Sequence, residues 1–564
     1  MKERRKRKGV VSWNALFWCT LLLVVTSIFF TTTFFFSPFD LQLSPLPFIS
    51  ETPTTISQPT ITIRETVILP DQALIFLNYP PSFRFHTKHD LLCLYFSADS
   101  TNRITQPPIQ LHFARLREQI VRCKLPPRGN SVSLFIKSDG VLPTKDSSTH
   151  PWTPLVYEAL FDRDNTTIVF VKGLNLRPER FIQPSTLNCI FGWDFSKPKF
   201  FLKSDVISGA QEIIRCNTPK SVIIGQEQSQ SIKVTIKERD REIFPSIARP
   251  GLRPRYSNKS TKKAHEICIC TMLRNQARFL REWVMYHAKI GVERWFIYDN
   301  NSDDDIEDVI SFLQRIGYNI SQHLWPWVKT QEAGFAHCAL RARSSCKWVA
   351  FIDVDEFFHI RVNGDLSRMI WHHAKPGQKV GEIRILCFSF GPSGQREVPR
   401  EGVAVGYTCR LSGSERHKSI VRPEALNQTL INVVHHFHLR APFVSVDAEK
   451  RKIVINHYKY QVWEVFKEKF YRRVATYVAD WQQAENVRSK DRAPGLGTKP
   501  VEPPDWPNRF CEVRDNGLKN WVLKNFLDRR SHLLPWQPEF QNRIRKRRRR
   551  KDKTQRIVLG KNLF

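Results

Sequence analysis

Residues 348–358 read WVAFIDVDEFF, an apolar run that passes directly into two aspartates and a glutamate. The run Trp348–Ile352 predicts a buried β-strand, because short continuous apolar segments are typical of strands covered on both faces. Asp353 and Asp355 are two positions apart, so both side chains leave an extended chain on the same side. Hard divalent cations combine such carboxylates with substrate phosphates. The stretch predicts a metal and diphosphate site, although Asp-x-Asp can also be a chance pattern that caps a helix.

Strands and helices alternate upstream of this stretch. We expect strands at 266–271, 293–298 and 319–325, and helices at 277–290, 305–316 and 333–342. The first helix has its apolar residues on one face, at Phe279, Leu280, Trp283, Val284 and His287. Such alternation predicts an α/β domain with a largely parallel sheet. Ligands of these sheets bind at the carboxyl ends of the strands, which points to Asp299 after the second strand and to Asp353 after the fourth.

The preceding region has a different pattern. Short β-branched and aromatic runs, separated by Pro, Gly and Asn, predict an all-β accessory domain over 61–240. The runs lie at 73–77, 91–96, 131–137, 167–171, 199–202 and 231–236. Such a domain can be purely structural or can bind carbohydrate, and the sequence leaves both readings open. Residues 241–262 are rich in Pro and Arg and predict a linker before a catalytic domain at 263–530.

The N-terminus combines a basic cluster with a long uncharged segment. Residues 1–12 begin MKERRKRK, and Trp13–Phe36 contains no charged residue. At about 1.5 Å per residue the uncharged segment makes roughly 36 Å of helix, enough to cross a hydrocarbon core of about 30 Å. We expect a transmembrane signal anchor at 13–36, because cleaved signal peptides have shorter apolar regions. The basic flank predicts a cytoplasmic N-terminus, and the Pro-, Ser- and Thr-rich segment 37–60 predicts a stem.

The formal net charge of +33 is partly concentrated at the two ends. Six basic residues lie in the N-terminal cluster and nine lie between Arg543 and Lys553. The basic tail 531–564 is either a solvated end or a surface for an acidic partner, and a lumenal location argues against nucleic acid. Of the 12 cysteines, Cys19 lies in the predicted anchor. The odd number that follows leaves at least one thiol outside an intramolecular pair.

Several long motifs occur together in the second half of the chain. They are ICTMLRNQARFLREWVMYHAKIGVERWFIYDNNSDD, WVAFIDVDEFF, FGPSG, RHKSIVRPE, VVHHFH and INHYKYQVWEVFKEKF. In this order they closely resemble glycosyltransferase family 92 over about Lys263 to Leu527, and most closely its plant members, which include pectic β-1,4-galactan synthases. CIFGWDF at 189–195 is similar to the accessory domain of the plant enzymes. The resemblance implies a GT-A (Rossmann-like) fold, a UDP-sugar donor and inversion at the anomeric carbon.

The resemblance also implies roles for individual residues. Asp353 and Asp355 match the motif that binds the metal, expected to be manganese, and Asp353 also the diphosphate. Asp299 resembles a uridine or ribose contact, and Arg274 and Asn275 match the motif near the nucleotide. His457 resembles the C-terminal histidine that ligates the metal, although taken alone it is more often structural. The motif commonly reads Asn-Glu, whereas this chain has Asn275-Gln276.

An inverting transfer needs a base that deprotonates the acceptor hydroxyl. Glu397, Glu415 and Glu424 are the candidates, and Glu415 is our choice, although each can equally be a surface carboxylate. Lys418 and Arg422 fit either a phosphate contact or a solvated strand edge. We expect the neighbouring histidines at 435, 436 and 438 to pack in the core rather than bind a metal.

These features together predict a single-pass type II enzyme of the Golgi membrane with a lumenal catalytic domain. It would transfer a hexose, with galactose expected, from a UDP-sugar to a polysaccharide or oligosaccharide of the cell wall such as pectic β-1,4-galactan. The alternative is a membrane-anchored lectin that lacks catalysis, and metal-dependent UDP binding separates the two. No nucleic-acid partner is expected, and an oligomer is compatible with the sequence.

Overall fold

The structure is a computed structural model. It describes residues 61–80, 83–97, 103–115, 118–138, 140–142, 148–174, 181–195, 198–224, 232–239, 241–251, 263–375, 377–433, 435–476 and 502–542. The predicted anchor at 13–36, its cytoplasmic flank and the stem lie outside these residues. No helix within the described ranges is long and apolar enough to cross a membrane. The segment Thr60–Phe564 forms one compact unit, and all contacts below are within it.

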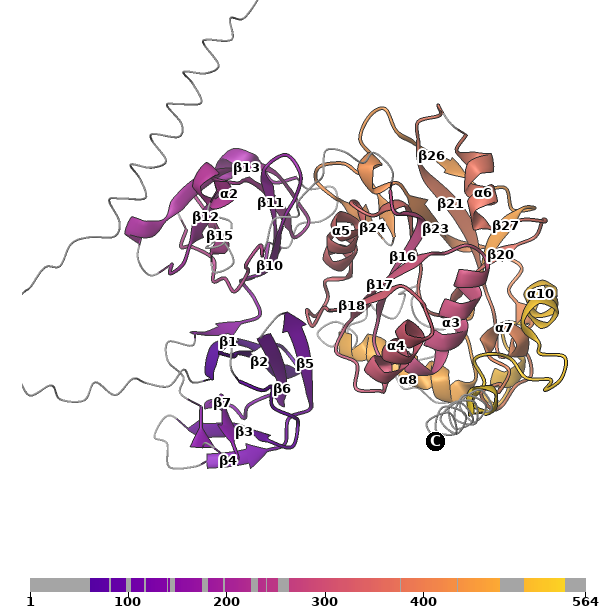
Figure 1. The fold of residues 1–564 in the computed structure, drawn as a ribbon, viewed down its shortest axis with the longest axis horizontal. Coiled ribbons are helices and arrows are strands. Elements are labelled where there is room, and N and C mark those ends of the chain that lie inside the picture. The colour runs from indigo at the N-terminus through magenta and orange to yellow at the C-terminus, as the bar shows by residue number, and fades with distance from the viewer. Residues whose placement is uncertain are drawn as a thin grey trace, which may run out of the picture. The chain divides into compact units, whose positions relative to one another are not determined.

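The first β-unit consists of two sheets (Figure 1). One has the strand order β5 (Gln110–Arg115), β6 (Glu118–Lys124), β2 (Gln72–Asn78), β1 (Thr62–Ile68), β9 (Ser148–Pro151). The other has the order β4 (Arg103–Gln106), β3 (Leu91–Ser97), β7 (Asn130–Ile136), β8 (Gly140–Val141). A disulfide between Cys93 and Cys123 joins β3 to β6 and so links the two sheets. Their facing side chains form a separate apolar core.

The second β-unit is a single curled sheet with its own core. Its order is β10 (Leu155–Phe161), β11 (Thr166–Lys172), β14 (Ile213–Asn217), β13 (Leu202–Ala210), β12 (Leu187–Gly192), β15 (Lys233–Glu238), with 3-10 turns at Pro184–Thr186 and Pro198–Phe200 and helix α2 (Lys220–Ile224). A disulfide joins Cys189 to Cys216. The strand predicted at 199–202 is wrong except for Leu202, because Pro198 begins a helical turn, where its fixed φ fits.

The second half of the chain confirms the predicted strand–helix alternation. Its elements are β16 (His265–Leu273), α3 (Ala277–Lys289), β17 (Arg294–Asp299), α4 (Ile306–Arg315), β18 (Ile320–Leu324), α5 (Gln331–Ala342) and β19 (Cys346–Phe351). Strands β18, β17, β16 and β19 lie side by side and are parallel. The sequence therefore predicts this half-sheet to within a few residues at each end.

The sheet then continues with strands that the sequence analysis does not place. The order after β19 is β23 (Glu415–Val421), β21 (Val380–Ser389), β27 (Ile453–His457), β20 (Glu356–Ile360), and β26 (Val444–Asp447) pairs with β21. The remaining elements are α6 (Leu366–His373), α7 (Val403–Gly406), β22 (Cys409–Arg410), η4 (Pro423–Ala425), β24 (Asn432–Val433), β25 (His436–Phe437), α8 (Trp463–Thr476), η5 (Trp506–Asn508), β28 (Val513–Arg514) and α10 (Gly517–Phe526). Strand β23 is antiparallel to β19, so the sheet is mixed.

The two faces of β16 carry different partners. Ile267 and Ile269 point into the core that contains α3, α4 and α6. Cys268 and Cys270 point to the opposite face, where they form disulfides with Cys346 and Cys338. A fifth disulfide in the described residues joins Cys409 to Cys511, and Cys387 is the buried cysteine that stays free. One thiol is thus left over, as the odd cysteine number predicts.

The predicted domain limits fall inside packed structure. Ser246, Ile247 and Ala248, in the predicted linker, are buried. At the other end, Leu534 and Trp536 lie in the core of the catalytic domain, and the Trp536 indole N–H donates a 2.9 Å hydrogen bond to the Glu401 carbonyl oxygen. The folded chain therefore extends past the predicted boundary at 530.

Candidate active site

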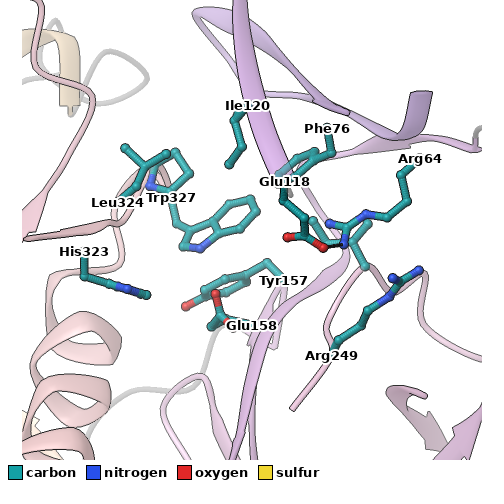
Figure 2. Close-up of a pocket in the computed structure, with 12 residues that line it drawn as sticks. Arg64, Phe76, Glu118, Ile120, Tyr157, Glu158, Arg249, His323, Leu324 and Trp327 are labelled. Atoms are coloured by element: carbon teal, nitrogen blue, oxygen red, sulfur yellow. Dashed lines mark hydrogen bonds and ion pairs between the residues drawn. The ribbon is translucent and has the colours of Figure 1, made fainter. Parts of the chain in front are cut away.

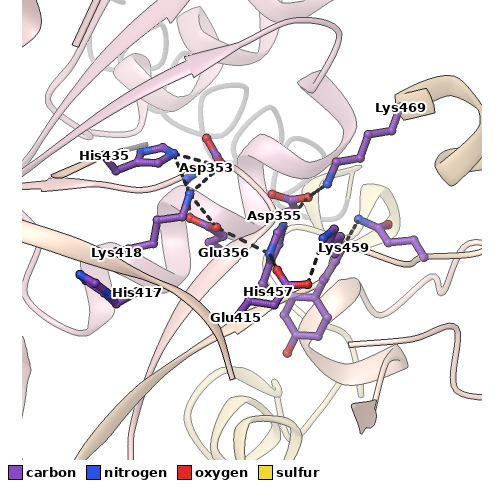
Figure 3. Close-up of polar contacts among 12 residues, drawn as sticks. Asp353, Asp355, Glu356, Glu415, His417, Lys418, His435, His457, Lys459 and Lys469 are labelled. Carbon is purple, nitrogen blue, oxygen red and sulfur yellow. Dashed lines mark hydrogen bonds and ion pairs between the residues drawn. The ribbon is translucent and has the colours of Figure 1, made fainter. Parts of the chain in front are cut away.

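The Asp-x-Asp sequence forms the turn between β19 and β20, at the carboxyl end of the buried strand. Val354 is buried, whereas the Asp353 side chain is 33% exposed. Glu356 closes the turn, because its Oε2 atom accepts a 2.9 Å hydrogen bond from the Asp353 backbone N–H. Figure 3 shows the carboxylates of Asp353 and Asp355 within one cluster of basic side chains. The strand end thus presents both aspartates, as the sequence predicts.

His457 is brought to this turn by strand register. It lies directly opposite Glu356 in the antiparallel pair of β20 and β27. Its Nε2 atom is 3.6 Å from Asp355 Oδ2. Its Nδ1 atom is 3.8 Å from Glu356 Oε1 and 3.7 Å from Glu415 Oε2. The ring therefore turns one nitrogen to Asp355 and the other to two supporting carboxylates, which is how partners orient a metal-binding histidine.

Two lysines neutralise the aspartates. Lys418 Nζ is 2.9 Å from Asp353 Oδ2 and 2.9 Å from Glu356 Oε1, and Lys469 of α8 forms an ion pair with Asp355. Burial by itself raises the pKa of both aspartates, but Lys418 beside Asp353 and Lys469 beside Asp355 outweigh it. Both carboxyls consequently have a pKa well below the usual range and are ionised at neutral pH.

Glu415, the predicted base, also lies in the cluster. It begins β23, opposite Cys387 of β21, and its Oε1 atom accepts a 2.9 Å hydrogen bond from Lys459. Burial would raise its pKa, but the nearby His457 ring and the charge of Lys459 lower it well below the usual range. The two other candidate bases have different surroundings. Glu397 is exposed, and Glu424 forms an ion pair with Lys263.

The predicted nucleotide contact Asp299 is the last residue of β17 and is fully buried. Its Oδ1 atom accepts a 2.9 Å hydrogen bond from the Ser302 backbone N–H, and its Oδ2 atom accepts one of 3.2 Å from Gln322. In this structure the carboxylate is engaged in holding the loop that follows β17. A direct ribose contact would have to reach the acceptor positions that these two bonds leave free on a fully buried side chain.

Arg274 and Asn275 follow β16 and lie against the same loop. Asn275 has φ +53°, a left-handed conformation that asparagine tolerates well. Its backbone N–H donates a 3.0 Å hydrogen bond to Ser302 Oγ, and its Oδ1 atom accepts one of 2.7 Å from the Asp303 N–H. Arg274 is 27% exposed, with Nη2 3.8 Å from Asp303 Oδ2. The structure thus brings three predicted nucleotide residues, Arg274, Asn275 and Asp299, to one place.

Sequence reasoning missed several members of the cluster. The sequence fits Lys418 to either a phosphate contact or a solvated strand edge, and the structure shows it as a buried partner of Asp353. His435 is buried, as expected, but its Nε2 atom is 2.7 Å from Lys418 Nζ and 3.7 Å from Asp353 Oδ2. The neighbouring His436 does not share these partners: its Nδ1 atom is 2.7 Å from Ser419 Oγ. No local sequence signal marks Lys418, because the pairing of Phe351 with Ser419 between distant segments sets it beside the aspartate turn.

The donor set suits a divalent cation. Asp353 and Asp355 offer oxygen atoms and His457 offers a nitrogen atom, ligands that manganese and magnesium accept. The ammonium groups of Lys418 and Lys469 lie against the two aspartates, so a bound cation would have to share these carboxylates with them or displace them. Glu356, Cys387 and His457 also have ligand atoms within 4.8 Å of one another, and all three residues are buried.

A second hollow lies between the β-units and the catalytic domain (Figure 2). Its lining includes Arg64, Glu118, Tyr157 and Trp327, and none of its lining residues belongs to the aspartate cluster. The cavity volume is about 50 Å³, room for a few water molecules. Arg64 and Glu118 form an ion pair within it. We therefore interpret it as part of the domain interface.

Comparison with known proteins identifies the class. Residues 263–490 match the model of glycosyltransferase family 92. A glycosyltransferase family 92 protein of Ricinus communis is 58% identical over 554 residues, which cover 95% of this chain and 100% of the relative. One from Oryza sativa subsp. japonica is 51% identical over 85% of this chain and 83% of its own length. The protein is a glycosyltransferase. It belongs to glycosyltransferase family 92, and its parallel half-sheet, with the aspartates at the carboxyl end of β19, agrees with the fold that the resemblance implies.

Solved structures resemble parts of the chain more distantly. A crystal structure of residues 1–349 of S. aureus TarS shares 14% identity, with a TM-score of 0.24 over 39% of this chain and 68% of that chain. The mannosyltransferase PcManGT from Pyrobaculum calidifontis, in complex with GDP-mannose and Mn²⁺, shares 10% identity with a TM-score of 0.24 over 42% and 70%. Similarity at this level identifies neither donor nor acceptor.

Proposed function

We propose that the protein transfers galactose from UDP-galactose to a cell-wall glycan, with pectic β-1,4-galactan as the expected acceptor, and inverts the anomeric carbon. The observation that carries the proposal is the cluster of Asp353, Asp355 and His457 at the carboxyl end of β19, the strand that pairs in parallel with β16, after which Arg274 and Asn275 follow. Under this proposal the aspartates would bind the diphosphate, and the residues that follow β16 would bind the nucleotide. The sugar and the acceptor rest on the resemblance to the plant members of the family.

Asp353, Asp355 and His457 would hold the divalent cation, with manganese expected. Such an ion neutralises charge on the departing diphosphate. Glu356 holds the backbone of Asp353 and faces His457 Nδ1, so it orients two of the three ligands. Lys418 and Lys469 add two positive charges within reach of the aspartates. Preorganised charges of this kind stabilise a leaving group without rearrangement during the reaction.

We propose Glu415 as the base that takes the proton from the acceptor hydroxyl. Its carboxylate is 31% exposed and stays ionised, the form that a base requires. Lys459 holds it in place but also reduces its basicity. We further propose that the enzyme is a type II protein of the Golgi membrane, anchored through residues 13–36, with the domain at 263–542 in the lumen.

The test is release of UDP by the purified chain without its predicted anchor, residues 50–564. The reaction contains UDP-galactose, manganese and a panel of pectic galactan oligosaccharides, and Asp355→Ala is the control variant. We expect acceptor-dependent release that EDTA and the substitution both abolish. If UDP binds with manganese but no acceptor is extended, the acceptor assignment is wrong. If no UDP binds at all, a glycan-binding protein without catalysis becomes the better description.

A further inference from the structure

The loop of residues 300–305, between β17 and α4, is bonded on several sides. The Asn300 backbone N–H donates a 2.8 Å hydrogen bond to the Leu273 carbonyl oxygen. Asn301 Nδ2 donates one of 2.9 Å to the Pro326 carbonyl oxygen, and Asp304 Oδ2 accepts one of 2.8 Å from the Ala277 N–H at the start of α3. These partners all belong to the catalytic domain. They connect the loop to β16, α3 and the segment after β18.

One further partner comes from the first β-unit. Arg122 lies on β6 and is only 2% exposed. Its Nη1 atom donates a 2.9 Å hydrogen bond to Asp303 Oδ1 and one of 3.3 Å to the Ser302 carbonyl oxygen. Its Nε atom donates a 2.8 Å hydrogen bond to Gln72 Oε1 on the neighbouring strand β2. The guanidinium group is therefore fixed to the β-sheet on one side and to the loop on the other.

Asp303 carries this connection to the predicted nucleotide residues. One carboxylate oxygen binds Arg122, and the other is 3.8 Å from Arg274 Nη2. The backbone N–H of Asp303 also donates to Asn275 Oδ1 at 2.7 Å. A single aspartate thus joins the β-unit to both residues that follow β16. Displacement of Asp303 would move Arg274 and release Asn275.

We propose that Arg122 is a positioning residue for the nucleotide-sugar site, so that the first β-unit forms part of the donor-binding machinery. The inference rests on the proposed function, since it assigns the nucleotide to Arg274 and Asn275. The physical reason is that a buried guanidinium is costly unless its donors are satisfied, so Arg122 and Asp303 hold each other at fixed distance. Arg122 preorganises the loop before the nucleotide arrives, which removes an ordering cost from binding.

A matched control exists at another contact between the β-units and the catalytic domain. Arg343 precedes β19, and its Nη1 atom is 2.9 Å from Asp162 Oδ1 and 3.1 Å from Asp162 Oδ2. Asp162 follows β10 of the second β-unit and is 4% exposed. This ion pair also joins a β-unit to the catalytic domain, but it includes no residue of the 300–305 loop. Its loss should destabilise the protein without a specific effect on the nucleotide.

The experiment compares Arg122→Gln, Arg343→Gln and wild type in the anchor-free chain. Titration calorimetry gives the Kd of UDP with manganese, steady-state assays give KM for UDP-galactose and kcat, and hydrogen exchange reports on the amides of residues 300–305. For Arg122→Gln we expect Kd and KM to rise about tenfold, since charge-assisted hydrogen bonds are strong, with a smaller change in kcat and faster exchange in the loop. For Arg343→Gln we expect a lower Tm but wild-type Kd and loop exchange.

Asp303→Asn provides a second route if Arg122→Gln folds poorly, because the Asp303 side chain is 41% exposed and tolerates substitution more easily. It should raise the Kd of UDP as much as Arg122→Gln does. The double variant should bind UDP no more weakly than either single variant, because both substitutions break the same contact. Wild-type Kd and loop exchange in folded Arg122→Gln or Asp303→Asn would overturn the inference. If wild type binds no UDP, the proposed function fails, and loop exchange in the variants still decides whether Arg122 positions the loop.

Discussion

The carboxylate of Glu415 contacts both Lys459 and His457, so a substitution can distinguish a base from a residue that only orients the histidine. We expect Glu415→Gln to lower kcat by about 100-fold or more, the usual contribution of a general base. The Kd of UDP with manganese should stay unchanged, because Asp353, Asp355 and His457 remain. Steady-state kinetics and calorimetry measure the two quantities. A Kd that rises as much as kcat falls would assign Glu415 to support of His457 instead.

Asn300 lies in an Asn-x-Ser sequon, but its side chain is engaged inside the protein. Its Nδ2 atom donates hydrogen bonds of 2.7 Å to the Trp325 carbonyl oxygen and 3.2 Å to that of Trp327. An attached glycan would replace one of the two Nδ2 hydrogens and would have to fit beside these carbonyl oxygens, so we expect Asn300 to be unmodified in protein secreted from eukaryotic cells. Asn319 is the control, because it has the same motif and is exposed. Peptide mass spectrometry decides the point, and a glycan on Asn300 would contradict this geometry.

The residues that could be predicted from the sequence are those with a local signal. Asp353 and Asp355 follow directly on an apolar strand, so their position depends on neighbours in the chain. His457 could be named only through a family resemblance, and Glu415 only as one of three candidate carboxylates, because strand pairing across distant segments brings them to the turn. Lys418 and Lys469 have no local signal, since their sequence neighbourhoods fit a strand edge and a helix surface equally well.

At the scale of elements, helix α3 carries a buried histidine that should make the fold less stable as the pH falls. His287 is surrounded by aromatic rings, and its Nδ1 atom is 2.7 Å from the Trp283 carbonyl oxygen. Burial lowers its pKa to about 3 from 6.5. The fold therefore favours neutral His287, and this stabilisation is complete above pH 6.5. It is lost as the pH falls toward 3, by up to about 1.4 kcal/mol per pH unit.

In His287→Leu we expect Tm to decrease less between pH 6.5 and pH 4 than it does in wild type. This difference in slope does not depend on how the substitution changes Tm at pH 7. Thermal unfolding across this range measures the slope. His372→Leu is the control, since His372 lies on α6 with its side chain 46% exposed. An unchanged slope in His287→Leu would show that other groups cause the acid sensitivity of the fold.

The elements that the sequence predicts well are those with a long periodic pattern. Helix α3 and strands β16, β17 and β19 agree with prediction to within a few residues. Strands β23, β21, β27 and β20 carry most of the site, yet the sequence analysis does not place them. Glu415 begins β23, Lys418 lies within it, and Asn456 and His457 end β27. These polar residues conceal the apolar pattern of the two strands. The polar residues that the site requires thus weaken the apolar pattern by which its strands could be predicted.

At the scale of the whole molecule, the β-units and the catalytic domain share one apolar core. Trp152 of the loop after β9 stacks on Trp327, with ring centroids 5.6 Å apart and an interplanar angle of 5°. Phe170 of β11 and Trp325 also lie in this core, together with residues of α5. The face of β16 that carries Cys268 and Cys270 is covered in this way. The accessory region is therefore part of the structure of the catalytic domain, whether or not it also binds glycan.

This shared core predicts that the catalytic domain does not fold well alone. A chain of residues 263–542 would expose Trp325, Trp327 and the neighbouring apolar side chains, which are buried in the intact protein. Exposed apolar patches of this kind cause association, so we expect the shortened chain to aggregate or to bind a hydrophobic dye, whereas residues 61–542 stay monomeric. Size-exclusion chromatography and dye fluorescence compare the two. A monomeric 263–542 chain with wild-type UDP affinity would mean that the catalytic domain needs the β-units neither to keep this core folded nor, through Arg122, to bind the donor.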